Sequence, residues 1–326
     1  MKSSKAITYH AHGKPHEVLQ LEERPLPQVR GKQAKVRLLA AVIHPSDMGM
    51  IAGSYGRLKE LPAVAGREGL GEVIEVGDEV SCVAVGDRVR FPEDEGAWQT
   101  ACVVSADKLW KIPHDIPVEL AAMAFINPPT SWRLLRDGNL QEGEWVIQNA
   151  ANSAVGQFVI QMARSLKLKT LNVVRNSDYI EPLKKMGADV VVLEDSGYEK
   201  KIEELTGGQE IRLALNSVGG ESANRLVKSL GFGGQHVTFG GMTGEPIRFP
   251  TRALIFQQVS LRGFWLDLWY RQNSRDRIEI MFNRIFSMMQ EGELTAPVDK
   301  TFKLEAFQEA LQANRDSRLG KVLLVP

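Results

Sequence analysis

One stretch of the sequence, residues 145–175, constrains the fold of this chain more than any other. It begins with an apolar run at 145–147, passes through a turn of small and polar residues at 149–156, and continues with apolar residues at the spacing of one helical face. A second apolar and β-branched run follows at 170–174. This order of strand, tight turn, helix and strand predicts one βαβ half of a dinucleotide-binding fold, in which the start of the helix faces a pyrophosphate.

The turn in this unit departs from the glycine-rich fingerprint G-x-G-x-x-G. Only Gly156 stands in register with that motif, and Ala151 and Ala154 are small substitutes for the other glycines. Small residues are needed here because the backbone has to approach a pyrophosphate closely. The motif alone is therefore a weak signal, and its context between two strands strengthens it.

The end of the second strand bears on which cofactor binds, because the ribose of a dinucleotide is read there, roughly 20 residues after the turn. An acidic residue favours the 2′-hydroxyl of NADH, whereas this run continues into Arg175, Asn176 and Ser177. A guanidinium group with polar neighbours suits a 2′-phosphate, and we predict NADPH. Arg175 could instead be an ordinary exposed residue at a strand end, and the nearby Asp178 keeps NADH open.

The pattern along the chain predicts an α/β protein with two domains. Residues 1–117 show short strands broken by glycine and proline, which indicates a mainly β domain. Residues 118–297 alternate helices and strands, including helices at 119–125 and 198–205 and an apolar segment at 259–266, as in a Rossmann-type, doubly wound parallel sheet. Residues 298–326 contain a last strand, 321–325, that we expect to return to the β domain.

Charge and cysteine content narrow the class of protein. The 40 basic and 40 acidic residues balance, which predicts no general attraction to nucleic acid or to an anionic membrane. No apolar run is long enough to span a bilayer, and the strand-like residues 6–9 leave no room for a signal or transit peptide before them. Cys82 and Cys102 are expected to be thiols rather than a disulfide. We therefore expect a cytoplasmic protein that acts on a small molecule.

Six short motifs are spread over nearly the whole chain: I-H-P-S-D at 43–47, G-S-Y-G at 53–56, L-P-A-V-A-G-R-E-G at 61–69, Q-N-A-A-N-S at 148–153, F-G-G-M at 239–242 and L-R-G-F-W-L at 261–266. Together they resemble motifs of the medium-chain dehydrogenase/reductase superfamily, and within it those of the zinc-free 2-enoyl thioester reductases, the mitochondrial-type trans-2-enoyl-CoA reductases. The resemblance implies a GroES-like catalytic β domain, a Rossmann domain that binds NADPH, and a role in fatty acid metabolism.

The same resemblance implies the residues of the site. Tyr55 falls on the position of the family's proton-donating tyrosine, and Arg67 and Trp265 are expected at the substrate pocket. The expected cofactor-binding residues are His44, Asn127, Thr130, Asn152, Ser153, Ala154, Val155, Gly156, Arg175, Asn176, Ser177, Phe239, Gly240, Gly241, Met242, Phe264, Trp265, Leu266 and Lys321. Three of these positions depart from the family, which has asparagine at 44 and 67 and glycine at 154; the first two bear on acyl specificity.

Several of these residues have a second interpretation. Tyr55 can donate a proton, because a phenol stays protonated at neutral pH, or it can be a surface aromatic in a loop. His44 is a second acid, a clamp, or simply a hydrogen-bonding residue. Arg67 meets a substrate anion, or it pairs with Glu68 or another acid. Trp265, with Phe264, lines an acyl pocket or a subunit interface. Lys321 reaches the cofactor or lies exposed near the C-terminus.

Zinc is not expected in this chain. A zinc alcohol dehydrogenase of the same superfamily would have a cysteine near position 44 and a histidine at 67, where this chain has His44 and Arg67. Cys82 and Cys102 also lack the C-x-x-C spacing of a structural zinc site.

The leading hypothesis is a zinc-independent reductase that transfers hydride from NADPH to the β carbon of an enoyl-CoA or enoyl-ACP thioester and a proton from Tyr55 to the α carbon. A quinone or enone reductase of the same superfamily is the main alternative, because its cofactor residues would look the same. A non-catalytic NADPH-binding protein is a further alternative. The segment 259–266 resembles the edge strand through which family members dimerise, so we expect a homodimer.

Overall fold

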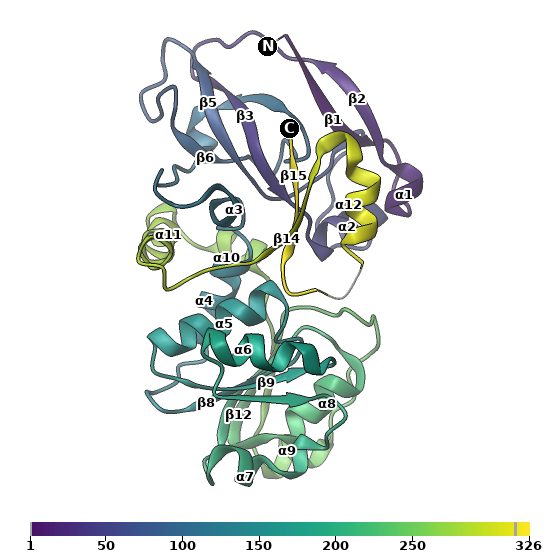
Figure 1. Ribbon diagram of the computed structural model, residues 1–326, viewed down its shortest axis with the longest axis vertical. Coiled ribbons are helices and arrows are strands. Elements are labelled where there is room, and N and C mark those ends of the chain that lie inside the picture. Colours follow the sequence, from purple (N-terminus) through teal and green to yellow (C-terminus); the bar gives the residue numbers. More distant parts are fainter. Residues whose placement is uncertain (1, 316–317) are drawn as a thin grey trace. The chain divides into compact units, whose positions relative to one another are not determined.

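The computed structural model describes residues 2–315 and 318–326 (Figure 1). The chain forms two compact units, one made of Met1–Ile126 with Pro297–Pro326 and the other of Asn127–Ala296. The first boundary falls after Ile126, not after residue 117, because the short helix α3 (Val118–Ala121) packs against strand β3 (Gln33–Val42) of the first unit. The helix expected at 119–125 is correspondingly short.

Two sheets make up the first unit. The smaller has the strand order β2-β1-β4, and the larger has the order β14-β15-β3-β5-β6, with β7 also paired to β3. Pairing is antiparallel throughout, except between β14 and β15. The strands are β1 (Ser3–Tyr9), β2 (Gln20–Pro25), β3, β4 (Ala63–Val64), β5 (Gly69–Val76), β6 (Arg88–Arg90), β7 (Ala101–Ser105), β14 (Val298–Lys303) and β15 (Lys321–Val325).

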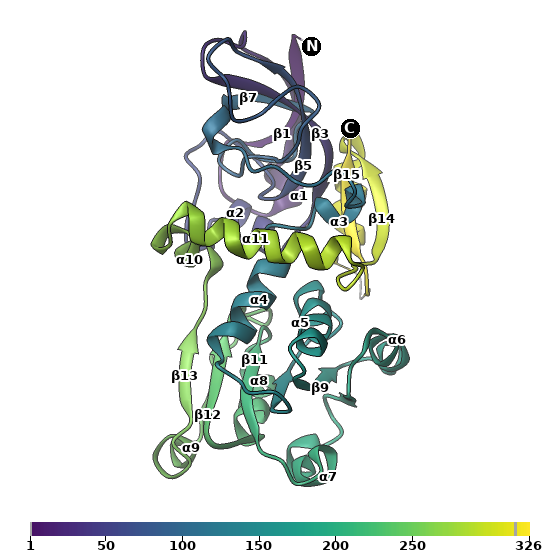
Figure 2. The ribbon, with the colours of Figure 1, turned by 90° about the vertical axis from the view of Figure 1, so that its left-hand side faces the viewer.

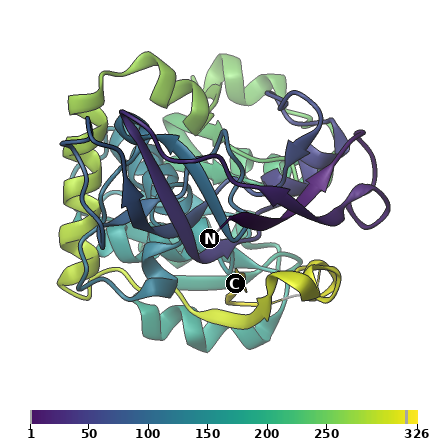
Figure 3. The same ribbon diagram turned by 90° about the horizontal axis from the view of Figure 1, so that it is seen from above.

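The last strand returns to this β domain, as the sequence predicted. β15 pairs with β3, so that Leu323 lies opposite Val42 and Leu324 lies opposite Ala41. All four of these side chains are buried and join the core of the unit. The first and last strands of the chain, β1 and β15, therefore both belong to the first unit. Figure 3 marks the two ends of the chain.

The first unit also contains short helices, of which α2 (Pro45–Ala52) matters most for the site. Sequence patterns did not predict α2, because it is only eight residues long and contains Gly49 in its interior. Asp47 fixes its start by accepting a hydrogen bond from the backbone N–H of His44 at 2.6 Å, and Gly53, with φ of 79°, ends it. The other helices are α1 (Pro15–Val18), η1 (Ala106–Lys108), α3, η4 (Leu304–Ala306) and α12 (Phe307–Ala313).

Position 66, in the core of the β domain, requires a glycine because the backbone there passes close to the side chain of Trp98. Gly66 has φ of +86°, and a Cβ there would lie 2.2 Å from Cδ1 of Trp98, whose side chain is fully buried. Trp98 is held in turn by a hydrogen bond from its indole N–H to the carbonyl oxygen of Val42, 3.3 Å. The backbone can therefore pass close to Trp98 at Gly66, and Arg67 and Glu68 follow directly in the sequence.

The second unit is built on a six-stranded sheet with the order β10-β9-β8-β11-β12-β13. All neighbouring pairs are parallel, as the alternation of helices and strands predicted, and Figure 2 shows β13, β12, β11 and β9 in that order across the sheet. The strands are β8 (Trp145–Gln148), β9 (Lys169–Val174), β10 (Val190–Leu193), β11 (Ile211–Asn216), β12 (Leu230–Thr238) and β13 (Ser260–Gly263). This arrangement confirms the Rossmann-type sheet.

Two expected elements of this unit differ in the structure. The helix expected at 198–205 is divided at Lys201 into η3 and α7, and the apolar segment 259–266 contains only the short strand β13 before α10 begins at Leu266. The helices are α4 (Asn127–Asp137), α5 (Ala154–Ser165), η2 (Ser177–Tyr179), α6 (Ile180–Met186), η3 (Tyr198–Lys200), α7 (Ile202–Thr206), α8 (Gly220–Lys228), α9 (Thr251–Phe256), α10 (Leu266–Gln272) and α11 (Arg275–Gln290). None of the helices in the described part of the chain has the length and apolar composition needed to cross a bilayer.

Candidate active site

The turn between β8 and α5 has the geometry of a nucleotide-binding loop. Ser153 caps α5, because its hydroxyl oxygen accepts a hydrogen bond from the backbone N–H of Gly156 at 3.1 Å. A Cβ on Gly156 would lie 2.6 Å from the carbonyl oxygen of Ala151, so only glycine lets the helix start this close to the turn. The two small residues that replace fingerprint glycines, Ala151 and Ala154, stand at the turn and at the first helical position. The helix N-terminus that results suits an anionic group.

A network of amide side chains holds this turn to the carboxyl ends of the central strands. The side-chain amide nitrogen of Asn149 donates to Asn216 at 2.8 Å and to the hydroxyl of Ser222 at 3.0 Å. Its side-chain oxygen accepts from the backbone N–H of Ser217 at 2.9 Å. Asn149 and Asn216 are both buried. The loop after β8 is therefore tied to the loop after β11, although no sequence motif assigns Asn149 an individual role.

The residues expected to read the ribose lie at the end of β9. Arg175 is exposed, directly after the last residue of the strand. Asn176 turns toward Asp178: its amide donates to the Asp178 carboxylate at 3.1 Å, and its side-chain oxygen accepts from the Asp178 backbone N–H at 2.9 Å. Because the Asp178 carboxylate is engaged with Asn176, the exposed guanidinium of Arg175 is the better-placed group for a 2′-phosphate.

Two further expected segments adjoin the same edge of the sheet. Phe239 and Met242 donate backbone hydrogen bonds to the carbonyl oxygens of Asn216 and Ser217, at 2.9 and 3.0 Å. The backbone N–H of Phe264 donates to the carbonyl oxygen of Thr238, the last residue of β12, at 2.9 Å. The structure therefore brings residues 239–242 and 264–266 to the carboxyl end of the parallel sheet, which is where nucleotide ligands bind in such folds.

The buried side chain of Asn127 also indicates that a ligand binds near the start of α4. It is the first residue of α4 and is 5% exposed, yet its side-chain amide nitrogen has no hydrogen-bond partner among the described residues. A buried amide without a partner costs free energy, so a group that accepts its hydrogen bond is expected. Thr130, one helical turn further on, is also buried. A dinucleotide with many oxygen acceptors meets this requirement.

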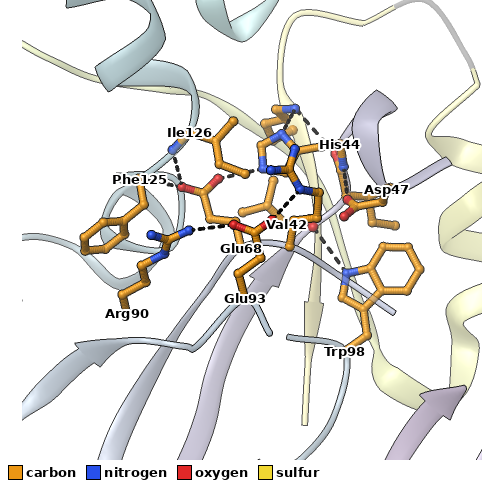
Figure 4. A network of polar contacts seen from close by, with 12 residues as sticks. Val42, His44, Asp47, Glu68, Arg90, Glu93, Trp98, Phe125 and Ile126 are labelled. Atoms are coloured by element: carbon orange, nitrogen blue, oxygen red, sulfur yellow. Dashed lines mark hydrogen bonds and ion pairs between the residues drawn. The ribbon is translucent and has the colours of Figure 1, made fainter. Parts of the chain in front are cut away.

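The β domain contains a buried chain of three polar side chains. The imidazole Nε2 of His44 lies 2.6 Å from Oε2 of Glu68, and its Nδ1 lies 3.2 Å from the ammonium nitrogen of Lys321. The other oxygen of Glu68 accepts from the backbone N–H groups of Phe125, at 2.5 Å, and Ile126, at 2.8 Å. Figure 4 shows Glu68 between His44 on one side and these two backbone groups on the other.

Burial governs the charges in this chain. Burial raises the pKa of Glu68 to about 7, although its backbone hydrogen bonds and nearby cations oppose the shift. Burial also lowers the pKa of Lys321 to about 8 and, together with the charge of Lys321, holds the pKa of His44 well below its ordinary value. His44 is therefore neutral at pH 7. An ammonium group can only donate, so Nδ1 of His44 accepts from Lys321 and its Nε2–H donates to Glu68.

These contacts bear on the interpretations of His44 and Lys321 that the sequence left open. His44 hydrogen-bonds within the protein as a neutral imidazole, which does not favour its role as a second acid. Lys321 is 8% exposed, so it is not an exposed residue near the C-terminus. Its ammonium also lies 3.4 Å from the carbonyl oxygen of Ile43.

Tyr55 is held by a second polar cluster of the β domain. It lies in the turn after α2, half-buried, and its hydroxyl accepts a hydrogen bond from Nη1 of Arg67 at 2.8 Å. Nε of Arg67 donates to Glu93 at 2.8 Å, and the other oxygen of Glu93 accepts from Arg90 at 3.1 Å. An acid paired with Arg67 is thus Glu93. A tyrosine hydroxyl bonded to a fixed cation is well suited to giving up a proton.

The positions that would hold zinc in a zinc-dependent relative are occupied differently here. A guanidinium group has no free electron pair at neutral pH, so Arg67 cannot be a ligand. Within residues 2–315 and 318–326, no group of three or more His, Cys, Asp or Glu residues could hold a metal ion. Cys82 and Cys102 are free thiols.

Comparison with known proteins identifies the family. The mitochondrial enoyl-[acyl-carrier-protein] reductase of Mus musculus is 43% identical over 318 residues, which cover 95% of this chain and 85% of the relative. The Homo sapiens protein of the same name is 41% identical over the same shares of the two chains. The chain belongs to this family of enoyl thioester reductases. Residues 30–114 match the alcohol dehydrogenase GroES-like domain, and residues 154–282 match the zinc-binding dehydrogenase family.

Solved structures agree with this family and its fold. A 2-enoyl thioester reductase heterodimer from Candida tropicalis superposes with a TM-score of 0.92 at 28% identity, over 100% of both chains. A structure assigned as an NADPH:quinone reductase from Bacillus thuringiensis superposes with a TM-score of 0.91 at 30% identity, over 99% of both chains. The GroES-like β domain and the Rossmann domain of the reductase fold are therefore confirmed.

Within the reductase family, the structure adds residues that sequence reasoning did not single out. Glu93 holds Arg67 across 26 positions of the chain, and Glu68 holds His44 across 24 positions, so no local sequence pattern links either pair. Arg90 holds Glu93 in turn. The adjacent pair Arg67-Glu68 is a sequence signal that could have indicated these partners. Two neighbouring charged residues after Gly66, in an otherwise apolar segment, need oppositely charged or hydrogen-bonding partners when they are buried.

Trp265, expected at the substrate pocket, is placed at the start of α10. It is the N-cap residue of that helix, and the guanidinium carbon of Arg271 lies 5.1 Å from the centre of its ring. Its side chain is half-buried. Trp265 and Phe264 belong to the nucleotide-binding unit, whereas Tyr55 and Arg67 belong to the β domain.

Proposed function

We propose that this protein reduces the C=C bond of trans-2-enoyl thioesters with NADPH as the hydride donor, independently of zinc. The observation that carries the proposal is the hydroxyl of Tyr55, held 2.8 Å from the buried guanidinium of Arg67 in a chain that matches enoyl thioester reductases over nearly its whole length. In the Etr1p reductase, which superposes with a TM-score of 0.92 at 28% identity over 100% of both chains, NADP and crotonyl-CoA are bound together. A small enoyl thioester is therefore the first substrate to test.

The reaction needs two groups to act on the double bond. NADPH, when bound, supplies hydride to the β carbon. The resulting charge spreads from the α carbon to the thioester oxygen, and the α carbon then takes a proton. Tyr55 is the proton donor in our proposal, because its hydroxyl is fixed by Arg67 and a phenol is protonated at neutral pH.

The residues of the second unit fit NADPH in separate ways. The N-terminus of α5, capped by Ser153, suits the pyrophosphate, and the exposed Arg175 suits the 2′-phosphate. The unpartnered amide nitrogen of Asn127 suits a ligand oxygen. The cofactor-binding role of these residues and of Phe239–Met242 rests on this fit and on their place in the fold.

A quinone or enone reductase is the second candidate, favoured by the likeness to the Bacillus thuringiensis structure. Steady-state assays separate the two. We expect NADPH oxidation with crotonyl-CoA and with longer trans-2-enoyl-CoA or enoyl-ACP substrates, at a kcat/KM well above that for 1,4-benzoquinone. Turnover of quinones alone would replace the thioester proposal, and NADPH binding without turnover of any acceptor would indicate a non-catalytic protein.

We also propose that the protein is a homodimer joined through β13. This strand forms one edge of the six-stranded sheet, and Leu254, Ile255 and Phe256 of the neighbouring helix α9 are exposed apolar residues. An exposed strand edge and apolar side chains support pairing with a second copy. Light scattering is expected to give about twice the chain mass of 36.2 kDa, and a charge at the exposed edge position, Ser260→Lys, is expected to reduce it. A monomer mass for the unaltered protein would contradict the proposal.

We propose the cytoplasm as the location, with fractionation as the test. Free thiols at Cys82 and Cys102 fit a reducing compartment. Several relatives carry a mitochondrial name, so co-fractionation with a mitochondrial marker would replace this proposal.

A further inference from the structure

The β domain brings Tyr55 and Arg67 into direct contact. Tyr55 follows α2, and Arg67 lies between β4 and β5, twelve positions later. Nη1 of Arg67 donates to the hydroxyl of Tyr55 at 2.8 Å, and the guanidinium carbon lies 4.7 Å from the centre of the phenol ring. The cation therefore meets both the oxygen and the π face of the same tyrosine.

Arg67 is held rigidly in this position. Its side chain is 3% exposed, and Nε donates to one oxygen of Glu93 at 2.8 Å, while Arg90 donates to the other oxygen at 3.1 Å. Burial would raise the pKa of the Glu93 carboxyl, but the charges of Arg67 and Arg90 outweigh burial and lower that pKa. Glu93 is therefore a carboxylate at neutral pH. Figure 4 shows Arg90 and Glu93 in this arrangement.

The direction of the hydrogen bond determines where the Tyr55 proton can go. A guanidinium group only donates, so the hydroxyl oxygen of Tyr55 accepts from Arg67. The O–H proton of Tyr55 is therefore not directed at Arg67. A cation 2.8 Å from the oxygen also favours the negatively charged phenolate over the neutral phenol.

We propose that Arg67 is a positioning residue for proton transfer: it aims the hydroxyl of Tyr55 at the α carbon of the substrate and stabilises the phenolate that remains after the proton has left. This inference rests on the proposed function. Arg67 acts through Tyr55, and Glu93 acts through Arg67 by fixing the plane of the guanidinium.

The step balances without a further reagent. The C=C π bond breaks as hydride, which NADPH would supply with its two electrons and so be oxidised to NADP⁺, bonds to the β carbon. The displaced electron pair resides on the α carbon and the thioester oxygen. The α carbon then bonds to the proton of Tyr55, and the O–H electron pair stays on the phenol oxygen next to Arg67. Solvent water returns a proton to the phenolate before the next turnover.

Arginine places a net charge beside Tyr55 that an uncharged side chain would not. The amide of an asparagine can donate one hydrogen bond to a phenol but carries no net charge. Arginine adds both the charge and the second contact, to Glu93, which fixes its orientation. The variant Arg67→Asn therefore removes the charge and keeps a side chain that can donate a hydrogen bond.

The competing role for Arg67 is direct binding of a substrate phosphate or carboxylate. The buried side chain favours the positioning role, because its Nε and Nη1 atoms already donate to Glu93 and Tyr55 within the protein. Loss of a residue that binds a substrate anion would instead appear in KM. Loss of a positioning residue appears in kcat.

The first measurement compares wild type, Arg67→Asn, Arg67→Lys and the control Arg37→Met, which removes a half-exposed arginine paired with Glu72 on the same domain. With crotonyl-CoA and NADPH, we expect Arg67→Asn to lower kcat by at least about tenfold, with KM for the thioester and Kd for NADPH changed by less than about threefold. Arg67→Lys, which keeps the charge, is expected to recover part of kcat. Arg37→Met should behave as wild type.

The second measurement does not depend on turnover. The near-ultraviolet absorbance of tyrosinate, taken as the difference between each protein and its Tyr55→Phe derivative, reports the ionisation of Tyr55 alone. Removal of the cation is expected to move this ionisation up by about one pH unit or more in Arg67→Asn, whereas Arg67→Lys should stay nearer wild type. The basic limb of the kcat/KM profile should move in the same direction.

These two measurements separate the possible failures. An unchanged Tyr55 titration and an unchanged kcat in folded Arg67→Asn would overturn the positioning role, as would a rise in thioester KM with normal kcat. If Arg67→Asn does not fold, Arg67→Lys decides: wild-type KM with reduced kcat supports the proposal, and raised KM alone overturns it. If wild type reduces no thioester, the proposed function fails, while the titration still tests the effect of Arg67 on Tyr55.

Discussion

Nε2 of His44 and Oε2 of Glu68 lie 2.6 Å apart in the interior of the β domain. Both side chains are at most 2% exposed, and Lys321 donates to the other ring nitrogen of His44. The hydrogen bonds therefore run in one direction, from Lys321 to His44 and from His44 to Glu68. His44 can donate its hydrogen bond only if the Glu68 carboxyl accepts it. The protonation state of this one buried carboxyl therefore affects the hydrogen bonds of all three side chains.

The buried carboxyl of Glu68 should give the protein a measurable pH dependence of stability. Its pKa is about 7 in the folded protein and 4.5 in the absence of burial, so the folded state holds the proton more tightly. The corresponding stabilisation is complete below pH 4.5 and is lost as the pH rises to about 7. The loss amounts to at most about 3 kcal/mol.

Urea unfolding of wild type and Glu68→Gln between pH 4.5 and 8 measures this effect. The free energy of unfolding of wild type, relative to the variant, is expected to fall as the pH rises through this window. A glutamine does not titrate, so the variant lacks this contribution. A difference that stays constant with pH, or that grows in favour of wild type, would show that Glu68 is ionised throughout.

Replacing the phenol hydroxyl should affect chemistry more than binding. We expect Tyr55→Phe to lower kcat with crotonyl-CoA by roughly 10²- to 10⁴-fold, the range for loss of a general acid, with Kd for NADPH unchanged. Tyr198→Phe is the matched control, because the Tyr198 hydroxyl is buried without a hydrogen-bond partner among the described residues. Wild-type turnover by Tyr55→Phe would remove this tyrosine from the mechanism.

The exposed guanidinium at the end of β9 should discriminate between the two nicotinamide cofactors. Loss of charged hydrogen bonds costs about 1.5–3 kcal/mol each, so Arg175→Ala is expected to weaken NADPH binding by roughly 10- to 100-fold. Calorimetry should find NADH binding nearly unchanged. Lys169→Ala, at the opposite end of the same strand, removes a charge as a control. Equal weakening of both cofactors by Arg175→Ala would refute the 2′-phosphate role.

The close packing of α5 on its turn should make one glycine intolerant of substitution. Gly156→Ala places a Cβ 2.6–2.8 Å from backbone atoms of Ala151, which cannot move aside as a side chain can. We expect a loss of about 1–3 kcal/mol in stability and weaker NADPH binding. Gly263→Ala, whose Cβ would have its nearest contact at 3.9 Å, should leave the melting temperature nearly unchanged. An undisturbed Gly156→Ala protein would contradict the packing argument.

Local pattern was sufficient to predict the main elements. The run at 145–147, the helix after Gly156 and the run at 170–174 correspond to β8, α5 and β9, and the last strand, Lys321–Val325, has the expected bounds. Elements without a clear period were missed or misjudged, such as α2, with a glycine in its interior, and the region after Tyr198, where Lys201 separates two short helices. Short elements depend on caps and contacts more than on their own pattern.

The sequence by itself determined the two domains, the nucleotide-binding turn and the likeness of Tyr55 to a proton donor, because hydrophobic periodicity and short motifs are local properties. Tertiary structure alone decided that Arg67 pairs with Glu93, that its guanidinium meets Tyr55, and that Lys321 faces His44 across 277 positions of the chain. Buried charges take whichever partner the packed core brings within hydrogen-bonding distance, and sequence separation does not encode that distance.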